Sequence, residues 1–253
     1  MQNENERKLM LEAVMSEARG KLTVIAHIGS NSTVESVRLA KHAKSLGVDA
    51  VSSIPCVYYG FSPKAIQRHW EEMINATDLP FIIYHIPQTT RFNLQMSLFE
   101  HMASNEKVIG IKCSSESTFE LQQFKYHGTR VKNGEFIVFN GPDEQFVAGR
   151  MIGADSGIGG TYGVMPELFM KLDELIKNNE IEKARELQNE VNEIICKLLS
   201  GPSLYGVCKY ILELRGIKTG SPRLPMLPIE TDEQKEFCSK INDLINDTIK
   251  KWK

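Results

Sequence analysis

Short apolar runs alternate along this chain with segments of helical periodicity, and that alternation limits the possible folds more than any other feature. Six runs are predicted as strands: Leu22–Ile28, Asp49–Ile54, Phe81–Ile86, Val108–Lys112, Phe136–Asn140 and Ser156–Gly159. Strands separated by helices of about 10–15 residues indicate βα units and a parallel sheet. Several runs are apolar at consecutive positions, as expected for strands that are buried on both faces.

Helical periodicity fills the segments between the strands and then the whole C-terminal part. The helices expected in the first part are Glu4–Ala18, Ser36–Leu46, Pro63–Ala76, Leu94–Ser104, Thr118–His127 and Glu144–Ile152. Those expected after residue 165 are Pro166–Asn178, Glu180–Leu199, Leu204–Arg215 and Thr231–Trp252. Because no long linker interrupts the pattern, we predict one α/β domain over residues 1–253, with a helical C-terminal part at 166–253.

The number of strands leaves two architectures open. A closed (β/α)8 barrel needs eight strands, and the first element here is a helix, so such a barrel would lack its first two strands. Six parallel strands could also form an open, doubly wound sheet. The glycine-rich stretch at residues 157–160 comes late and lacks the GxGxxG spacing of a nucleotide-binding loop, so it does not support that alternative.

Composition excludes several kinds of partner. The formal net charge of -2 gives no reason to expect binding to nucleic acid or to an anionic membrane. No apolar run approaches the ~18 residues of a membrane-spanning helix, and the polar N-terminus does not resemble a secretory signal. The 5 cysteines are scattered without a CxxC pair, which predicts free thiols in a reducing cytoplasm and no zinc site.

Lys112 is the most informative single position. It closes the apolar run VIGIK, and in a β/α barrel the C-terminal ends of the strands surround the active site. A free lysine is almost wholly protonated at neutral pH, but apolar walls favour the uncharged amine. An uncharged amine can attack a ketone to form an imine, which accepts electrons from a neighbouring carbon–carbon bond. The alternative is a strand-end lysine that extends into solvent.

Tyr84 and an acidic pair also lie at strand ends. The Tyr84 hydroxyl could exchange protons at the barrel mouth, or its ring could simply pack in the core. Asp143 and Glu144 follow the FIVFN strand, where they could bind sugar hydroxyls or cap the next helix. Taken alone, the cap is the favoured interpretation for the acidic pair.

Two loops and one histidine complete the candidates. The GIGGT stretch at 157–161 could bring backbone N–H groups close to a ligand, or it could form only a tight turn. Tyr58 and Tyr59 could reach a site or an oligomer interface, or lie exposed without a role. His85 alternates with Tyr84 and is predicted to pack under a helix on the opposite face of the strand.

Several of these segments together resemble one family. YYGFS, YHIP, GIKCSS, NGPDE and GADSGIGGTYGVMPELF, with GSNST at 29–33, are similar in order and spacing to the pyruvate-dependent aldolases of the dihydrodipicolinate synthase and N-acetylneuraminate lyase group. The likeness covers residues from about 4 to 228. NGPDE and GADSGIGGTY are closest to the lyase patterns, and Thr89 stands where synthases carry an arginine.

The resemblance implies a TIM-type barrel, a homotetramer and no cofactor. The activity it implies is cleavage of N-acetylneuraminate to N-acetylmannosamine and pyruvate. By position, Lys112 would form the imine with pyruvate and Tyr84 would relay a proton. The implied substrate contacts are Ser114, Gly141, Asp143, Glu144, Gly159 and Gly160. Tyr58 would lean into the site of a neighbouring subunit.

Departures from the family pattern leave alternatives open. The family's GxTGE-type motif, whose hydroxyls and N–H groups hold the pyruvate carboxylate, is absent from this sequence. His85 replaces the usual asparagine, Arg91 replaces a glycine, and Gly160 replaces a pocket serine. The alternatives are a related aldolase acting on another 2-keto acid, or an inactive, N-terminally truncated paralogue.

Overall fold

Parallel strands, taken in sequence order, build the first of two units into which the structure divides. The computed structural model describes residues 2–253, and its first unit holds residues up to Gly141 together with Ile152–Asp155. The strands of this unit are β1 (Ile25–His27), β2 (Ala50–Ser53), β3 (Phe81–His85), β4 (Val108–Cys113) and β5 (Ile137–Asn140). Each pairs in parallel with the next, which confirms the predicted parallel sheet.

Local signals set the ends of the helices between these strands. The helices are α1 (Glu4–Ala18), α2 (Thr33–Leu46), α3 (Pro63–Asn75), α4 (Pro87–Thr90), α5 (Met96–Ala103) and α6 (Thr118–Val131). The side chains of Ser32, Ser62 and Ser117 each accept a backbone N–H at the start of α2, α3 and α6. Gly47 ends α2 with a left-handed φ of 72°, a conformation that glycine adopts without strain.

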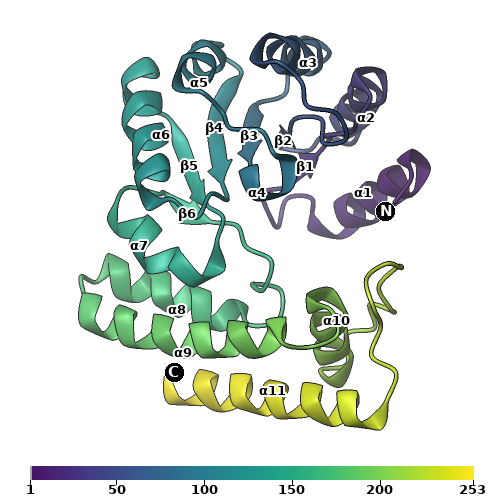
Figure 1. Ribbon diagram of the computed structural model, residues 1–253, viewed down its shortest axis with the longest axis vertical. Coiled ribbons are helices and arrows are strands. Elements are labelled where there is room, and N and C mark those ends of the chain that lie inside the picture. Colours follow the sequence, from purple (N-terminus) through teal and green to yellow (C-terminus); the bar gives the residue numbers. More distant parts are fainter. Residues whose placement is uncertain (1) are drawn as a thin grey trace. The chain divides into compact units, whose positions relative to one another are not determined.

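One face of the sheet packs against helices. Figure 1 shows α2, α3, α5 and α6 side by side along the strands β1–β5. Ile83 and Ile111 point into the core between these layers, where they join Trp70 and Phe124. Because side chains alternate along a strand, Tyr84 and Lys112 point to the opposite face, away from these helices. The larger apolar core of the first unit therefore lies on the helical side of the sheet, and Tyr84 and Lys112 lie on the other side.

The second unit is almost wholly helical and holds Pro142–Met151 and Ser156–Lys253. It contains a 3-10 turn (Asp143–Gln145), α7 (Phe146–Met151), β6 (Ser156–Gly157), α8 (Pro166–Lys177), α9 (Ile181–Leu199), α10 (Leu204–Leu214) and α11 (Asp232–Lys251). Its own core includes Leu172, Leu187, Ile211 and Ile245, each at most 2% exposed.

Most predicted elements are confirmed, and three need correction. The first strand covers only Ile25–His27, because the chain still turns at Leu22, whose N–H bonds back to Ala18 and whose side chain is 71% exposed. The last strand covers only Ser156–Gly157, and the expected helix over residues 144–152 divides into the 3-10 turn and α7. The short helix α4 was not predicted. The prediction of one domain over residues 1–253 stays a prediction.

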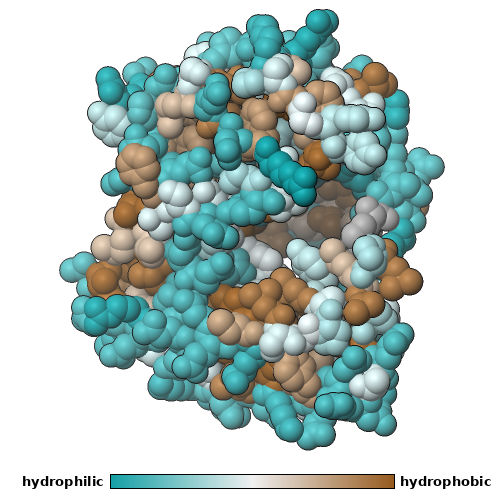
Figure 2. All heavy atoms as spheres, viewed as in Figure 1, coloured by the Kyte–Doolittle hydropathy of each residue, from teal (hydrophilic) through white to brown (hydrophobic). Residues whose placement is uncertain are grey.

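The surface mixes polar and apolar side chains. Hydrophilic residues cover most of the face in Figure 2, and hydrophobic ones gather in separate groups between them. Within residues 2–253, each helix is too short or too polar to cross a bilayer. The 5 cysteines are all free, as expected from their scattered positions.

Candidate active site

Lys112 and Tyr84 lie opposite each other on neighbouring strands. The register pairs Tyr84 of β3 with Lys112 of β4, so both side chains leave the same face of the sheet. The Lys112 Nζ donates a hydrogen bond of 3.0 Å to the Tyr84 hydroxyl, and it lies 4.1 Å from the centre of the tyrosine ring. Both side chains are half-buried. A potential nucleophile and a hydroxyl that can carry its proton are therefore in direct contact.

Ser114 and Gly141 meet at the same ends of the strands. The Ser114 N–H donates to the carbonyl of His85, and the Gly141 N–H donates to the carbonyl of Cys113. A Cβ atom at position 141 would lie 2.0 Å from the Ser114 Oγ, so only glycine fits beside this hydroxyl. These contacts hold Ser114, which follows Lys112 by two residues, with its hydroxyl against Gly141.

Asp143 gathers donors within the second unit. Its buried carboxylate accepts hydrogen bonds from the Gly160 N–H (3.2 Å), the Thr161 N–H (2.7 Å) and the Thr161 hydroxyl (2.5 Å). The interpretation of Asp143 as a helix cap is therefore wrong, because this carboxylate bonds the 160–161 loop and the turn has no side-chain cap. Glu144 beside it is exposed.

The Asp143 carboxylate also leaves no room for a side chain at Gly159. A Cβ atom there would lie 1.7 Å from the Asp143 Oδ1, whereas one at Gly160 would meet nothing within 4 Å. The nearby carboxylate and burial both raise the pKa of Tyr162, with burial the larger cause. The loop after β6 is thus built around one carboxylate and is more than the tight turn considered as the alternative.

The remaining predicted residues have diverse surroundings. Tyr58 is 78% exposed in the loop between β2 and α3, where its ring packs edge-on against Tyr59 at 4.8 Å. Thr89 is an exposed residue of α4, and Arg91 ends that helix with a left-handed φ of 54°. Within the described residues 2–253, none of Tyr58, Thr89 and Arg91 forms a hydrogen bond with the Lys112 side chain.

His85 packs on the helical side of the sheet, as predicted. It is 2% exposed, its ring lies edge-on to Phe124 of α6, and its Nε2 is 3.3 Å from a carboxylate oxygen of Glu120. The contact with His85 is the largest cause that lowers the pKa of Glu120. His85 therefore links β3 to α6 behind Tyr84.

Sequence reasoning missed His27. This residue lies on β1, and its ring meets the Tyr84 ring edge-on with centroids 6.0 Å apart. A polar residue between Ala26 and Ile28, both buried, was the available signal, because alternation places it on the face opposite to the core.

Comparisons with known proteins place the chain in a family. The model of the dihydrodipicolinate synthetase family matches residues 1–244. The chain belongs to this family. An N-acetylneuraminate lyase of Mediterraneibacter gnavus is 44% identical over 99% of this chain and 79% of its own length. N-acetylneuraminate lyase 2 of Escherichia coli is 34% identical, over 95% of this chain and 77% of its own length.

Solved structures of the family share the fold. The catalytic lysine mutant of Ruminococcus gnavus sialic acid aldolase superposes with a TM-score of 0.94 at 43% identity, over 100% of this chain and 82% of that one. A monomeric dihydrodipicolinate synthase variant, at 23% identity, gives a TM-score of 0.87 and shows the likeness of fold alone. The α/β fold with a parallel, barrel-like sheet is therefore that of this family, and the open, doubly wound alternative is not supported.

Proposed function

We propose that this chain is a Schiff-base aldolase that cleaves N-acetylneuraminate to N-acetylmannosamine and pyruvate. The observation that carries the proposal is the 3.0 Å contact between the Lys112 amine and the Tyr84 hydroxyl at the ends of paired strands. The family membership supports it, as do the lyase names of its relatives and the catalytic lysine named in one of them. We further propose that the six strands correspond to the last six of an eight-stranded barrel.

The chemistry assigns a step to each group. The uncharged Lys112 amine adds to the ketone carbon of the open-chain sugar acid, and loss of one water gives a protonated imine. The Tyr84 hydroxyl accepts the proton of the substrate hydroxyl two carbons away and passes its own proton to solvent, that substrate hydroxyl becomes the aldehyde of N-acetylmannosamine, and the carbon–carbon bond breaks. The bond electrons pass to the imine and form an enamine. A proton returned to the enamine carbon and addition of water then release pyruvate and the free lysine.

The proposed substrate contacts come from the residues around Ser114 and from those around Asp143. Ser114 and Gly141 would contact the pyruvate part, and Asp143, Glu144 and Gly159 would line the pocket for the sugar, beside Gly160. The exposed Glu144 is available for a ligand, whereas the three hydrogen bonds of Asp143 support a role in shaping the loop. The reaction uses a protein amine, so no metal or organic cofactor is part of the proposal.

The assembly and location are further proposals. The chain would form a homotetramer in which the exposed Tyr58 reaches a neighbouring subunit, and sedimentation of the purified protein measures that state. A cytoplasmic location is supported by the 5 free cysteines.

Borohydride trapping tests the imine. Reduction in the presence of pyruvate is expected to add one pyruvate, less one oxygen atom, to the peptide that carries Lys112. Lys112→Arg should remain unlabelled, whereas Lys64→Arg, a control at an exposed lysine of α3, should be labelled like the wild type. Folded wild-type protein that gains no adduct at Lys112 would overturn the proposal.

Turnover tests the substrate. Pyruvate release from N-acetylneuraminate is expected to require both Lys112 and Tyr84. Tyr84→Phe should reduce kcat by about 10²–10⁴, the usual contribution of a positioned proton carrier. If pyruvate forms the adduct but N-acetylneuraminate is not cleaved, the substrate assignment is wrong and the aldolase acts on another 2-keto acid.

A further inference from the structure

His27 is a third group at the lysine–tyrosine pair. The Tyr84 ring has the Lys112 Nζ over its face, 4.1 Å from the ring centre, and the His27 ring lies perpendicular to it, at an interplanar angle of 89°. The two rings come from β1 and β3, and the strand between them carries the small Ser52, which pairs with His27 in the register.

The imidazole is anchored through one nitrogen. The backbone N–H of Ile54 donates to His27 Nε2 at 3.3 Å. A nitrogen that accepts a hydrogen bond carries no proton, so the ring is neutral with its hydrogen on Nδ1. Gly29, two residues further on, leaves room for this ring, since a Cβ atom there would lie 2.9 Å from His27 Cε1.

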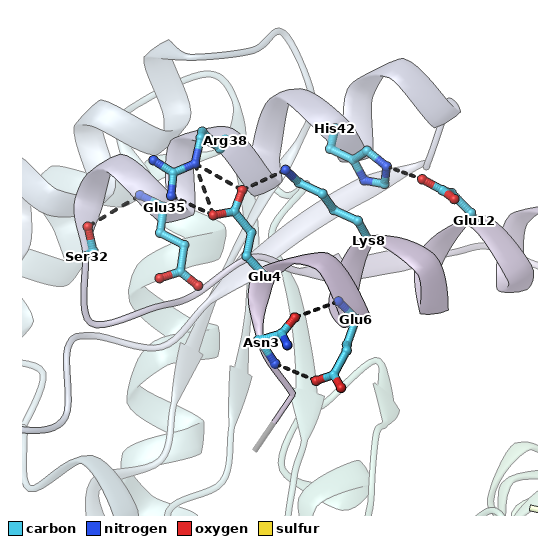
Figure 3. A network of polar contacts seen from close by, with 9 residues as sticks. All are labelled: Asn3, Glu4, Glu6, Lys8, Glu12, Ser32, Glu35, Arg38 and His42. Atoms are coloured by element: carbon cyan, nitrogen blue, oxygen red, sulfur yellow. Dashed lines mark hydrogen bonds and ion pairs between the residues drawn. The ribbon is translucent and has the colours of Figure 1, made fainter.

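Helix α1 holds the backbone of this histidine. Arg7 donates to the carbonyls of His27 (2.7 Å), the last residue of β1, and of Gly29 (2.9 Å), two residues after the strand ends. Figure 3 shows how α1 is attached to α2: Glu4 of α1 accepts from Arg38 of α2, and Lys8 contacts the same carboxylate from within α1. Glu12 contacts His42 in the same interface. The position of His27 is therefore fixed on its backbone as well as on its ring.

Nearby charges favour the neutral imidazole. The pKa of His27 is lowered. The largest cause is burial, which removes water from the charged ring, and the cations Arg7 and Lys112 lower it further. His27 is an exposed residue, which weakens the effect of burial on its pKa, but both cations act in the same direction. His27 lines a groove of about 600 Å³, and His42 of α2 lines the same groove. On β3, the titratable group that faces His27 is Tyr84.

We propose that His27 is a positioning residue of the candidate active site. Its neutral ring, hydrogen-bonded to the Ile54 N–H, packs perpendicular to the Tyr84 ring and keeps the tyrosine hydroxyl within hydrogen-bond distance of the Lys112 amine. This inference rests on the proposed function, in which Tyr84 carries a proton. A neutral ring supplies this support without placing another positive charge beside the amine.

Kinetics of matched histidine variants test the proposal. His27→Ala is expected to lower kcat by about 10–100-fold, the effect of a small misplacement of a reacting group, while KM and pyruvate trapping at Lys112 persist. His27→Gln should recover most of kcat, because its amide oxygen can accept from the Ile54 N–H. His42→Gln, at the other histidine of the groove, should behave like the wild type.

Nuclear magnetic resonance gives a readout that does not depend on turnover. In protein with ¹⁵N-labelled histidine, His27 should keep an unprotonated Nε2 between about pH 5.5 and 8, where ordinary histidines titrate. The Tyr84 ring-carbon signal, assigned through Tyr84→Phe, should move in His27→Ala and stay in place in His42→Gln.

Each outcome separates this inference from the proposed function. Wild-type protein that traps no pyruvate refutes the aldolase proposal, and the tyrosine signal then still decides whether His27 positions Tyr84. A charged His27 at neutral pH, an unmoved Tyr84 signal in His27→Ala, or a kcat within twofold of an active wild type would overturn the role of His27. So would a His27→Gln protein as slow as His27→Ala.

Discussion

Replacing Gly159 by alanine should damage the second unit far more than the same change at its neighbour Gly160. The new methyl group at 159 would lie 1.7 Å from the Asp143 Oδ1 and 2.5 Å from the Tyr162 ring, whereas one at 160 meets nothing within 4 Å. Neither glycine has a positive φ, so alanine is allowed by the backbone at both positions. The two variants therefore differ in space and not in backbone conformation.

The expected cost follows from the hydrogen bonds of the displaced carboxylate. Asp143 accepts two bonds from the buried Thr161 and a longer one of 3.2 Å from the exposed Gly160 N–H, which water can replace. A hydrogen bond to a charged group contributes about 1.5–3 kcal/mol, so losing both Thr161 bonds costs about 3–6 kcal/mol. Because the loop can shift and keep part of this hydrogen bonding, we expect Gly159→Ala to destabilise the loop by about 3 kcal/mol.

Local hydrogen exchange is the assay, because it reports on one loop in a chain with two units. The Thr161 amide should exchange much faster in Gly159→Ala, by the factor that corresponds to about 3 kcal/mol, or roughly 150-fold. Gly160→Ala should match the wild type or gain up to about 1 kcal/mol, the usual benefit of alanine at a compatible site. Equal protection of Thr161 in both variants would refute the reasoning.

Two further predictions concern pH and thiols. Because His85 lowers the pKa of Glu120 in the folded protein, the stabilisation is complete above the unfolded value of about 4.3 and is lost as the pH falls below it. Glu120→Gln should therefore flatten the fall of the unfolding free energy in acid, and an unchanged urea-denaturation profile would contradict this. The exposed Cys196 should react first with a thiol reagent in native protein, whereas burial raises the pKa of Cys113 to about 12 and should protect it until unfolding; mass spectrometry of the labelled peptides distinguishes the two.

The order and type of the elements could be predicted because each depends on a local pattern. Helix α1 has the predicted bounds Glu4–Ala18, and α8 ends one residue before the expected position. Strand ends were less predictable, because an apolar residue such as Leu22 fits a strand pattern even where the chain is still turning. Helix α4 is only four residues long and gives no periodicity to detect.

The candidate site was partly predictable for a related reason. Lys112 and Tyr84 were found because Lys112 closes an apolar run and Tyr84 lies near the end of another, and parallel strands bring such ends together. The partners of Asp143 were not, since its bonds to Gly160 and Thr161 join segments 17–18 residues apart in sequence. His27 was missed because its contact with Tyr84 crosses an intervening strand, a relation that no local pattern encodes.

The in-register pairing of Tyr84 with Lys112 has a consequence for how this protein can change over time. Point substitutions around the pair leave both side chains on one face of the sheet. A single-residue insertion or deletion within either strand would instead turn one of them toward the helices. Length variation within β3 and β4 should therefore be far less tolerated than exchange of their apolar residues. In a library of one-codon deletions across both strands, we expect few active variants.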